Sequence, residues 1–195
     1  DVEAVALAGG CAMNSVANGK VYRNTPFRKI YVQSAAGDAG GAIGAAFAVF
    51  HDLIRHGHSV NGRRFVMDHA YWGPHYSDTD VGSLIESRRT EILGSNCRIE
   101  VIPDENELCR RTAAYVAEGK VIGWFQGRME WGPRALGNRS ILADPRRANM
   151  KDILNLKIKR RESFRPFAPS ILREAVKDWF ETDDDVPFMM QVFKI

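Results

Sequence analysis

The amino-acid sequence predicts an α/β (α+β) protein made of two successive parts. Short apolar runs alternate with helical patterns along the chain, which indicates alternating strands and helices. The first part, up to about residue 60, is apolar and rich in glycine, whereas alternation of helices and strands dominates from about residue 68. Residues 61–64 between them resemble a linker. We therefore expect two domains, at residues 1–62 and 68–195.

The first part is expected to contain two strands and a long helix. Residues 2–8 form a mostly apolar run that ends in two glycines, which is typical of a buried strand followed by a tight turn. Residues 29–33 are predicted to form a second strand. A helix is expected over residues 39–55, because apolar residues recur there at helical spacing. These positions are Ile43, Phe47, Phe50 and Ile54.

Two capping signals mark helix starts in the second part. The pairs Ser77 and Asp80, and Asp104 and Glu107, have the spacing of capping boxes. Gly119 follows the second helical pattern and is expected to end that helix.

Three further elements are expected downstream. Residues 121–125 are predicted to form a strand because of their β-branched and aromatic content. The apolar pattern predicts helices over residues 146–158 and 171–180. The sequence contains no internal repeat and no heptad pattern.

Composition argues against a membrane span and a cysteine-based metal site. The chain has 195 residues, of which 45% are hydrophobic and 26% are charged. No stretch approaches the roughly 20 consecutive apolar residues that a membrane-spanning helix needs. The three cysteines and five histidines lack metal-binding spacing, and a reducing, cytoplasmic setting fits the cysteine usage. The chain begins at Asp1 and stops within an apolar run, so we expect it to be a fragment.

Residues 128–165 contain the strongest candidate site. This window carries eleven Lys or Arg against four Asp or Glu, whereas the formal net charge of the whole chain is +3. The confined basic cluster indicates an anionic ligand, because arginine offers a planar fork of donors to phosphate or carboxylate. Glycines at 127, 132 and 137 allow the backbone to approach such a ligand.

The alternative is a solvated basic face, which is the usual role of a charge run. Aromatic residues such as Trp131 and Phe164 alternate with the arginines, which places some charges beside apolar walls. A partly buried arginine needs an anionic partner, and this favours a pocket. Glu130 or Glu162 within the same window is an alternative partner.

Two glycine-rich turns are weaker candidates. Gly9 and Gly10 permit close approach to a nucleotide, and Asn14 offers an amide, although these residues taken alone favour a simple packing turn. Asp38 precedes the helix expected at 39–55. The residues alone favour a helix cap, and the alternative is an oxygen ligand for a hard metal ion.

Four segments together resemble the O-carbamoyltransferase family, whose members modify nodulation factors and antibiotics such as tobramycin and cephamycins. They are LAGGCAMNSVANGK (7–20), IYVQSAAGDAGGAIGAA (30–46), GWFQGRMEWGPRALGNRSILADPR (123–146) and KRRESFRPFAPSIL (159–172). The resemblance implies an actin-like ATPase lobe, of which residues 1–62 are the last part. It implies a truncated YrdC-like lobe over residues 68–195.

The resemblance also implies the ligands of the first lobe. Gly9, Gly10 and Asn14 are expected to bind the nucleotide, ATP. Asp38 is expected to hold a divalent metal, iron or magnesium. The histidine ligands of the family and the end of the YrdC-like lobe lie outside this sequence, so we expect the fragment alone to be inactive.

The implied reaction converts carbamoyl phosphate and ATP to carbamoyl-adenylate, and then transfers the carbamoyl group to an acceptor hydroxyl of a sugar, antibiotic or nodulation factor. Such chemistry needs positioning and positive charge more than a protein nucleophile. The expected contacts to carbamoyl phosphate or phosphate are Arg128, Arg134, Asn138, Arg139, Ser140, Lys159, Arg161 and Arg165. Among these, the expected catalytic residues are Arg134, Arg139 and Lys159.

Two other functions are compatible with parts of the sequence. An RNA-binding module of the YrdC type would use the basic window, but the long basic stripe and aromatic platform typical of RNA readers are missing. A kinase of the actin-like superfamily would use the glycine-rich part and leave the arginine motif without a role. We therefore expect small-molecule partners, namely carbamoyl phosphate, ATP and a hydroxyl acceptor, and neither a nucleic acid nor a membrane.

Overall fold

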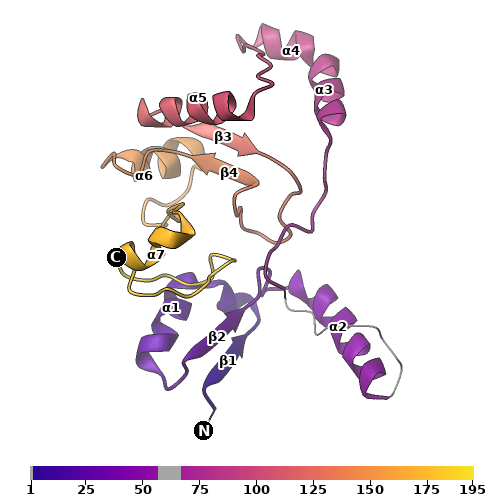
Figure 1. Cartoon of the computed structure of the whole chain (residues 1–195), viewed down its shortest axis with the longest axis vertical. Helices are drawn as coiled ribbons and strands as arrows, with labels where there is room; N and C mark the ends of the chain where they lie inside the picture. Colours follow the sequence, from indigo (N-terminus) through magenta and orange to yellow (C-terminus); the bar gives the residue numbers. More distant parts are fainter. Residues whose placement is uncertain (1, 57–66) are drawn as a thin grey trace. The chain divides into compact units, whose positions relative to one another are not determined.

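The computed structural model describes residues 2–56 and 67–195 (Figure 1). The chain forms two compact units, each assembled from segments that are separate in sequence. Unit 1 comprises residues 1–73, 130–136 and 170–195, and unit 2 comprises residues 74–129 and 137–169. Each unit combines helices with a two-stranded sheet, which confirms the α/β class. The expected domain division at residues 62–68 stays a prediction.

Two parallel strands organise unit 1. Strand β1 (Ala4–Leu7) pairs with β2 (Lys29–Val32), and Leu7 lies opposite Val32 at the carboxyl ends. Both strands were predicted from the sequence. The connection between them contains a short 3₁₀ turn, η1 (Gly10–Met13), and helix α1 (Ser15–Asn24).

The two helices of unit 1 begin differently. The side chain of Asn14 caps α1 by accepting a hydrogen bond from the backbone N–H of Ala17, at 3.1 Å. Helix α2 (Gly40–Arg55) follows β2 and confirms the helix predicted at 39–55. Its N-cap residue is Ala39 and makes no side-chain cap. The cap that Asp38 was alternatively expected to provide is therefore absent.

The core of unit 1 joins the β1–β2 region to the end of the chain. Asn18 of α1 is 3% exposed, and its side-chain amide donates to the carbonyl oxygens of Ala12 and Met190, at 2.8 Å each. The terminal segment accordingly lies beside α1 (Figure 1). The buried apolar cluster consists of Ala12, Val32, Ala36, Met67, Ala70, Phe188 and Met190.

Unit 2 is built on an antiparallel pair, β3 (Ile122–Phe125) and β4 (Arg139–Leu142). Strand β3 was predicted, whereas β4 was not, because its sequence Arg-Ser-Ile-Leu lies within the basic run and its pairing depends on β3. Helix α5 (Glu105–Ala117) lies along this pair (Figure 1). Gly119 after it has φ of +89°, which confirms the predicted glycine stop.

The remaining helices of unit 2 follow the capping signals. Helix α3 (Asp78–Ser87) begins with a complete capping box between Ser77 and Asp80. Helix α4 (Arg89–Gly94) continues from it. At α5 the side chain of Asp104 accepts a hydrogen bond from the backbone N–H of Glu107, which is one half of the predicted capping box.

Two predicted helices are shorter or wider than their patterns suggested. The helix expected at 146–158 is a single turn, α6 (Met150–Asp152), followed by a π-helix, η2 (Ile153–Ile158). The helix expected at 171–180 reduces to a 3₁₀ turn, η3 (Arg173–Ala175), and α7 (Val176–Trp179). The apolar spacing indicated the helical segments but did not define their hydrogen-bond pattern. None of the helices in the described part of the chain is long and apolar enough to span a membrane.

Candidate functional site

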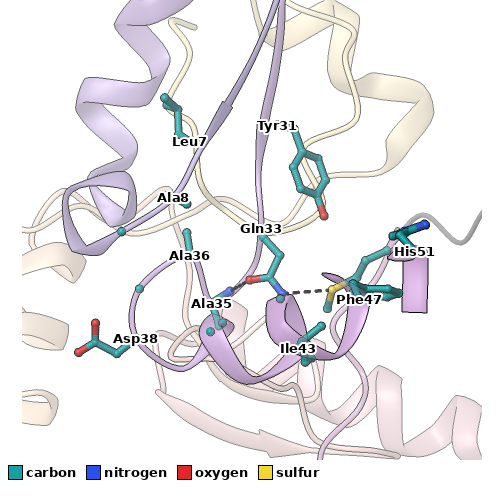
Figure 2. A pocket seen from close by; sticks show the side chains of 16 residues that line it. Leu7, Ala8, Tyr31, Gln33, Ala35, Ala36, Asp38, Ile43, Phe47 and His51 are labelled. Carbon is teal, nitrogen blue, oxygen red and sulfur yellow. Dashed lines mark hydrogen bonds between the residues drawn. The ribbon is translucent and has the colours of Figure 1, made fainter. Parts of the chain in front are cut away.

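Unit 1 contains a cleft of about 710 Å³ at the carboxyl ends of β1 and β2, with α2 along one side (Figure 2). Pockets of this size hold small-molecule ligands, and α/β proteins place them at the carboxyl ends of strands. The cleft is lined by Leu7, Ala8, Gly9, Tyr31, Gln33, Ala35, Ala36, Gly37, Asp38, Gly40, Gly41, Ile43, Gly44, Phe47, His51 and Met67.

Glycines form one end of the cleft. Gly9 has φ of +96°, and its N–H donates to the carbonyl oxygen of Ala36 at 2.7 Å, which joins the turns after the two strands. A side chain at Gly40 would overlap the carbonyl oxygen of Ala35, so only glycine fits there. This end coincides with the first turn of α2, where backbone N–H groups and the helix dipole favour an anion.

The expected nucleotide residues are distributed unevenly around this cleft. Gly9 lines it, whereas Gly10 and Asn14 lie outside its lining. The side-chain oxygen of Asn14 is engaged in capping α1. Its expected contact with nucleotide stays a prediction.

Asp38 lies at the rim of the glycine-lined end, and its side chain is exposed. In Figure 2 its carboxylate is on the opposite side of the cleft from Tyr31 and His51. No group of three or more His, Cys, Asp or Glu residues among the described residues is arranged to hold a metal ion. Asp38 therefore offers a single oxygen ligand, and the described residues do not complete a metal site around it.

Aromatic side chains form the other end of the cleft. Tyr31 projects from β2, while Phe47 and His51 project from successive turns of α2 (Figure 2). The rings of Phe47 and His51 are stacked, with centroids 6.2 Å apart and an interplanar angle of 25°. Partial burial raises the pKa of the Tyr31 hydroxyl, so this group stays protonated at neutral pH.

These aromatic residues were not predicted as site residues. The sequence places Phe47 on an apolar helix face, and His51 shows no catalytic or metal-binding spacing. A usable signal was present: Ile43, Phe47 and His51 lie on one face of the helix that begins at the glycine-rich turn. Only the position of β2 beside that face shows that Tyr31 joins them.

The structure does not gather the eight expected phosphate-binding residues into one unit. Arg134 belongs to unit 1, and the other seven belong to unit 2. The Arg134 guanidinium donates to the carbonyl oxygen of Met13 at 2.7 Å, and its Nε lies 3.2 Å from the sulfur of Met190. Half-burial lowers its pKa without removing its charge. Arg134 thus holds the turn that follows Gly10.

Four of the expected residues lie at the β3–β4 pair of unit 2. The side-chain amide of Asn138 donates to the carbonyl oxygen of Arg128 at 2.7 Å and accepts from Gln126 at 3.2 Å. Ser140 accepts a hydrogen bond from the backbone N–H of Gly137 at 3.1 Å. Arg139 begins β4, opposite Phe125. Arg128 and Arg139 therefore belong to one hairpin.

The remaining three, Lys159, Arg161 and Arg165, lie on the loop after the π-helix. Arg161 Nε donates to the side-chain oxygen of Asn155 at 2.7 Å, and its guanidinium lies over the Phe167 ring, 4.7 Å from the centroid. Arg165 pairs with Glu162 at 2.9 Å, so the internal partner considered from the sequence is present for this arginine. Arg161 is therefore engaged in holding the loop.

Two buried polar residues organise the basic segments: Glu130, which was considered from the sequence only as an arginine partner, and Asn155, which was not singled out. Glu130 is 3% exposed and accepts a hydrogen bond from the backbone N–H of Leu136 at 2.6 Å, which closes the 130–136 turn of unit 1. Asn155 is fully buried in unit 2, and its amide donates to the carbonyl oxygens of Ser163 and Arg165.

Two family models match this chain. Residues 1–47 match the carbamoyltransferase N-terminus, and residues 113–195 match the carbamoyltransferase C-terminus. Together the two models cover most of the sequence. The chain belongs to the carbamoyltransferase family.

Curated relatives agree with this assignment. The chain is 46% identical to an uncharacterized protein of Synechocystis over 98% of its length, and 45% identical to nodulation protein NolNO of Sinorhizobium fredii over 96%. It is 32% identical over 94% of its length to 3'-hydroxymethylcephem-O-carbamoyltransferase of Amycolatopsis lactamdurans. The matched regions span 30%, 26% and 31% of these three relatives, respectively.

Proposed function

We propose that the protein is an ATP-dependent O-carbamoyltransferase. The observation that carries this proposal is a nucleotide-sized cleft, lined by glycines at the carboxyl ends of parallel strands, in a chain of the carbamoyltransferase family. The proposed architecture places the cleft in an actin-like lobe and the β3–β4 arginines in a YrdC-like lobe.

The proposed reaction has two stages. Water hydrolyses carbamoyl phosphate to carbamate and inorganic phosphate, and an oxygen of the released carbamate attacks the α-phosphorus of ATP, so that pyrophosphate leaves and carbamoyl-adenylate forms. The acceptor hydroxyl then attacks the carbamoyl carbon, the O-carbamoyl bond forms, and AMP leaves. Each stage develops negative charge on phosphate oxygens, which positioned cations and backbone N–H groups stabilise.

The two units are proposed to bind different substrates. In unit 1, the glycine-lined end of the cleft would bind nucleotide phosphates, since it admits close approach of a ligand and the dipole of α2 favours an anion there. In unit 2, Arg128 and Arg139 would bind carbamoyl phosphate from the β3–β4 hairpin, and Lys159 from the following loop. Positive charge and fixed geometry are what this chemistry requires.

Asp38 remains the proposed ligand for a divalent cation. One carboxylate together with nucleotide phosphates and water is a usual environment for Mg²⁺. Iron would need further protein ligands beyond those that the described residues offer. A bound divalent cation would neutralise phosphate charge at this end of the cleft.

The proposed acceptor is the hydroxyl of a small molecule, such as a sugar, an antibiotic or a nodulation factor. One relative is named for carbamoyl transfer to a hydroxymethylcephem, and another is named a nodulation protein. We therefore propose an acceptor of this class.

Calorimetric titration of the purified chain with carbamoyl phosphate, and separately with ATP, tests the proposal. We expect both to bind. Arg139→Ala should weaken carbamoyl phosphate binding by about 10- to 100-fold, because a charge-assisted contact to phosphate is lost. The exposed Arg98, on the same unit, is the matched control, and Arg98→Ala should leave the affinity unchanged.

Two results would count against the proposal. If the folded chain binds neither ligand, its clefts do not serve this reaction. If folded Arg139→Ala retains full affinity while the wild type binds, the anion site is elsewhere and Arg139 is removed from it. Circular dichroism of each variant confirms that the fold is intact.

A further inference from the structure

We propose that Arg134 is a positioning residue that fixes the turns behind the glycine-lined end of the unit 1 cleft, and that it is not a ligand of carbamoyl phosphate. The inference rests on the proposed use of ATP, and it concerns a residue outside the lining of the cleft. It replaces the expectation from the sequence, in which Arg134 bound carbamoyl phosphate and was catalytic.

The guanidinium of Arg134 is engaged by groups of unit 1 that are distant in sequence. Its Nη2 donates a hydrogen bond to the carbonyl oxygen of Met13 at 2.7 Å, and its Nε lies 3.2 Å from the sulfur of Met190. Because a guanidinium is planar and rigid, contacts on two different nitrogens fix its orientation. These donors point at the protein, which is the arrangement of an anchor rather than of an anion ligand.

Met13 connects this anchor to the residues that line the cleft. It ends the 3₁₀ turn η1, whose N-cap is Gly9, and the N–H of Ala12 in this turn donates to the carbonyl oxygen of Gly9 at 3.0 Å. The N–H of Gly9 in turn donates to the carbonyl oxygen of Ala36 at 2.7 Å. A methyl group at Gly37 would lie 3.8 Å from Cγ of Met13, so the Met13 side chain packs beside the second turn. Fixing Met13 therefore restricts both glycine turns.

The segment that carries Arg134 is itself fixed to unit 1. Gly132 has φ of +108°, and a Cβ atom there would lie 3.1 Å from the carbonyl oxygen of Ser34, so the two backbones approach closely. The N–H of Trp131 donates to the carbonyl oxygen of Ala70 at 2.6 Å. Arg134 thus reaches Met13 from a rigid base, and little conformational entropy is lost in keeping the contact.

Titration of the purified chain with ATP and with carbamoyl phosphate separates positioning from phosphate binding. Arg134→Ala should weaken ATP binding by roughly 10- to 100-fold, the effect of losing one hydrogen bond from a charged group, and leave carbamoyl phosphate binding unchanged. Lys20 is an exposed cation on α1 of the same unit and does not line the cleft. Lys20→Ala removes the same charge and should leave both affinities unchanged.

Rescue distinguishes the hydrogen bond to Met13 from a general loss of packing. Arg134→Lys keeps a donor on a long side chain and should recover part of the ATP affinity. Guanidinium ion added at millimolar concentration should strengthen ATP binding to Arg134→Ala, because it can occupy the vacated space and donate to the Met13 carbonyl. The same addition should leave ATP binding to Lys20→Ala unchanged.

Hydrogen exchange of the chain without ligand tests the same contact independently of ATP. The amide protons of Gly9 and Ala12 should exchange roughly 10- to 100-fold faster in Arg134→Ala, because the turn opens more often when its anchor is lost. The amide protons of α5 in unit 2 should keep their wild-type rates.

The outcomes distinguish this inference from the proposed function. If Gly9 and Ala12 exchange at wild-type rates in Arg134→Ala, the inference is overturned whatever the ligands do. If folded Arg134→Ala loses affinity for carbamoyl phosphate and keeps it for ATP, Arg134 is a phosphate ligand, and the proposed function stands without the inference. If the wild type binds neither ATP nor carbamoyl phosphate, the proposed function fails and a nucleotide-positioning role fails with it.

Discussion

Asn155 offers the sharpest test of how the basic loop of unit 2 is held. It lies within the π-helix η2, fully buried, and makes three hydrogen bonds. Its amide nitrogen donates to the carbonyl oxygens of Ser163 and Arg165, at 3.2 and 3.1 Å, and its oxygen accepts from Arg161 at 2.7 Å. The backbone supports the same geometry, because Lys159 N–H bonds to the carbonyl of Leu154, five residues earlier, at 2.8 Å.

Asn155→Ala should therefore destabilise unit 2 strongly. A neutral hydrogen bond contributes about 0.5–1.5 kcal/mol and one to a charged group about 1.5–3 kcal/mol, so losing two of the first kind and one of the second costs roughly 2.5–6 kcal/mol. The neighbouring Leu156 is 58% exposed. Leu156→Ala is a surface substitution with an expected effect within about 0.5 kcal/mol.

Urea unfolding followed by tryptophan fluorescence measures this difference. The protein has four tryptophans, and Trp124 in β3 is the one that belongs to unit 2. A background that keeps only Trp124 reports on unit 2, and the tryptophans replaced by phenylalanine are Trp72, Trp131 and Trp179. If Asn155→Ala unfolds within about 1 kcal/mol of Leu156→Ala, the side chain does not hold the loop and the reasoning is refuted.

Two further predictions concern packing and acid stability. Gly19→Ala should destabilise unit 1 by about 1–3 kcal/mol or more, because the added methyl group would overlap the backbone of Val192. Gly82→Ala in α3 should stabilise unit 2 by about 0.5–1 kcal/mol, because its added methyl group meets no other atom. Equal thermal melting points for the two variants would contradict this prediction. Hydrogen bonds from Arg146 lower the pKa of Asp144 to about 2, below its unfolded value, so the pair stabilises unit 2 above about pH 4 and loses that effect as the pH falls through 2. When the free energy of unfolding is measured against pH, Asp144→Asn should lack this loss of stability at acid pH. Parallel curves for wild type and variant would show that the Asp144–Arg146 pair does not contribute to acid stability.

Most local structure was predictable from residue patterns. The apolar runs that became β1, β2 and β3 and the helical spacing that became α2 are local properties of the chain, and local sterics and burial favour the same conformations. The capping residues Ser77 and Asp104 act within one turn of their own helix, so their roles were also readable from the sequence. Family membership followed from long motifs such as residues 123–146, and the family models confirm it.

Side-chain assignments were less predictable, because spacing along a chain does not state which groups meet in space. Arg134 sits in the middle of the basic motif, yet it packs in unit 1 against Met13, more than a hundred residues away. Asn155 was not singled out from the sequence, and Glu130 was considered only as an arginine partner, because the burial of these side chains is decided by the tertiary structure.

The strands β1, β2 and β3, the helix starts and the family can thus be recognised from short-range sequence patterns without the tertiary structure. Strand β4, the π-geometry of η2 and the aromatic end of the cleft depend on partners distant in sequence. Tyr31 and Phe47 meet the same cleft only because β2 and α2 lie beside each other. Long-range packing decides these features, since burial and hydrogen bonding between distant segments outweigh the weak local preference of each residue.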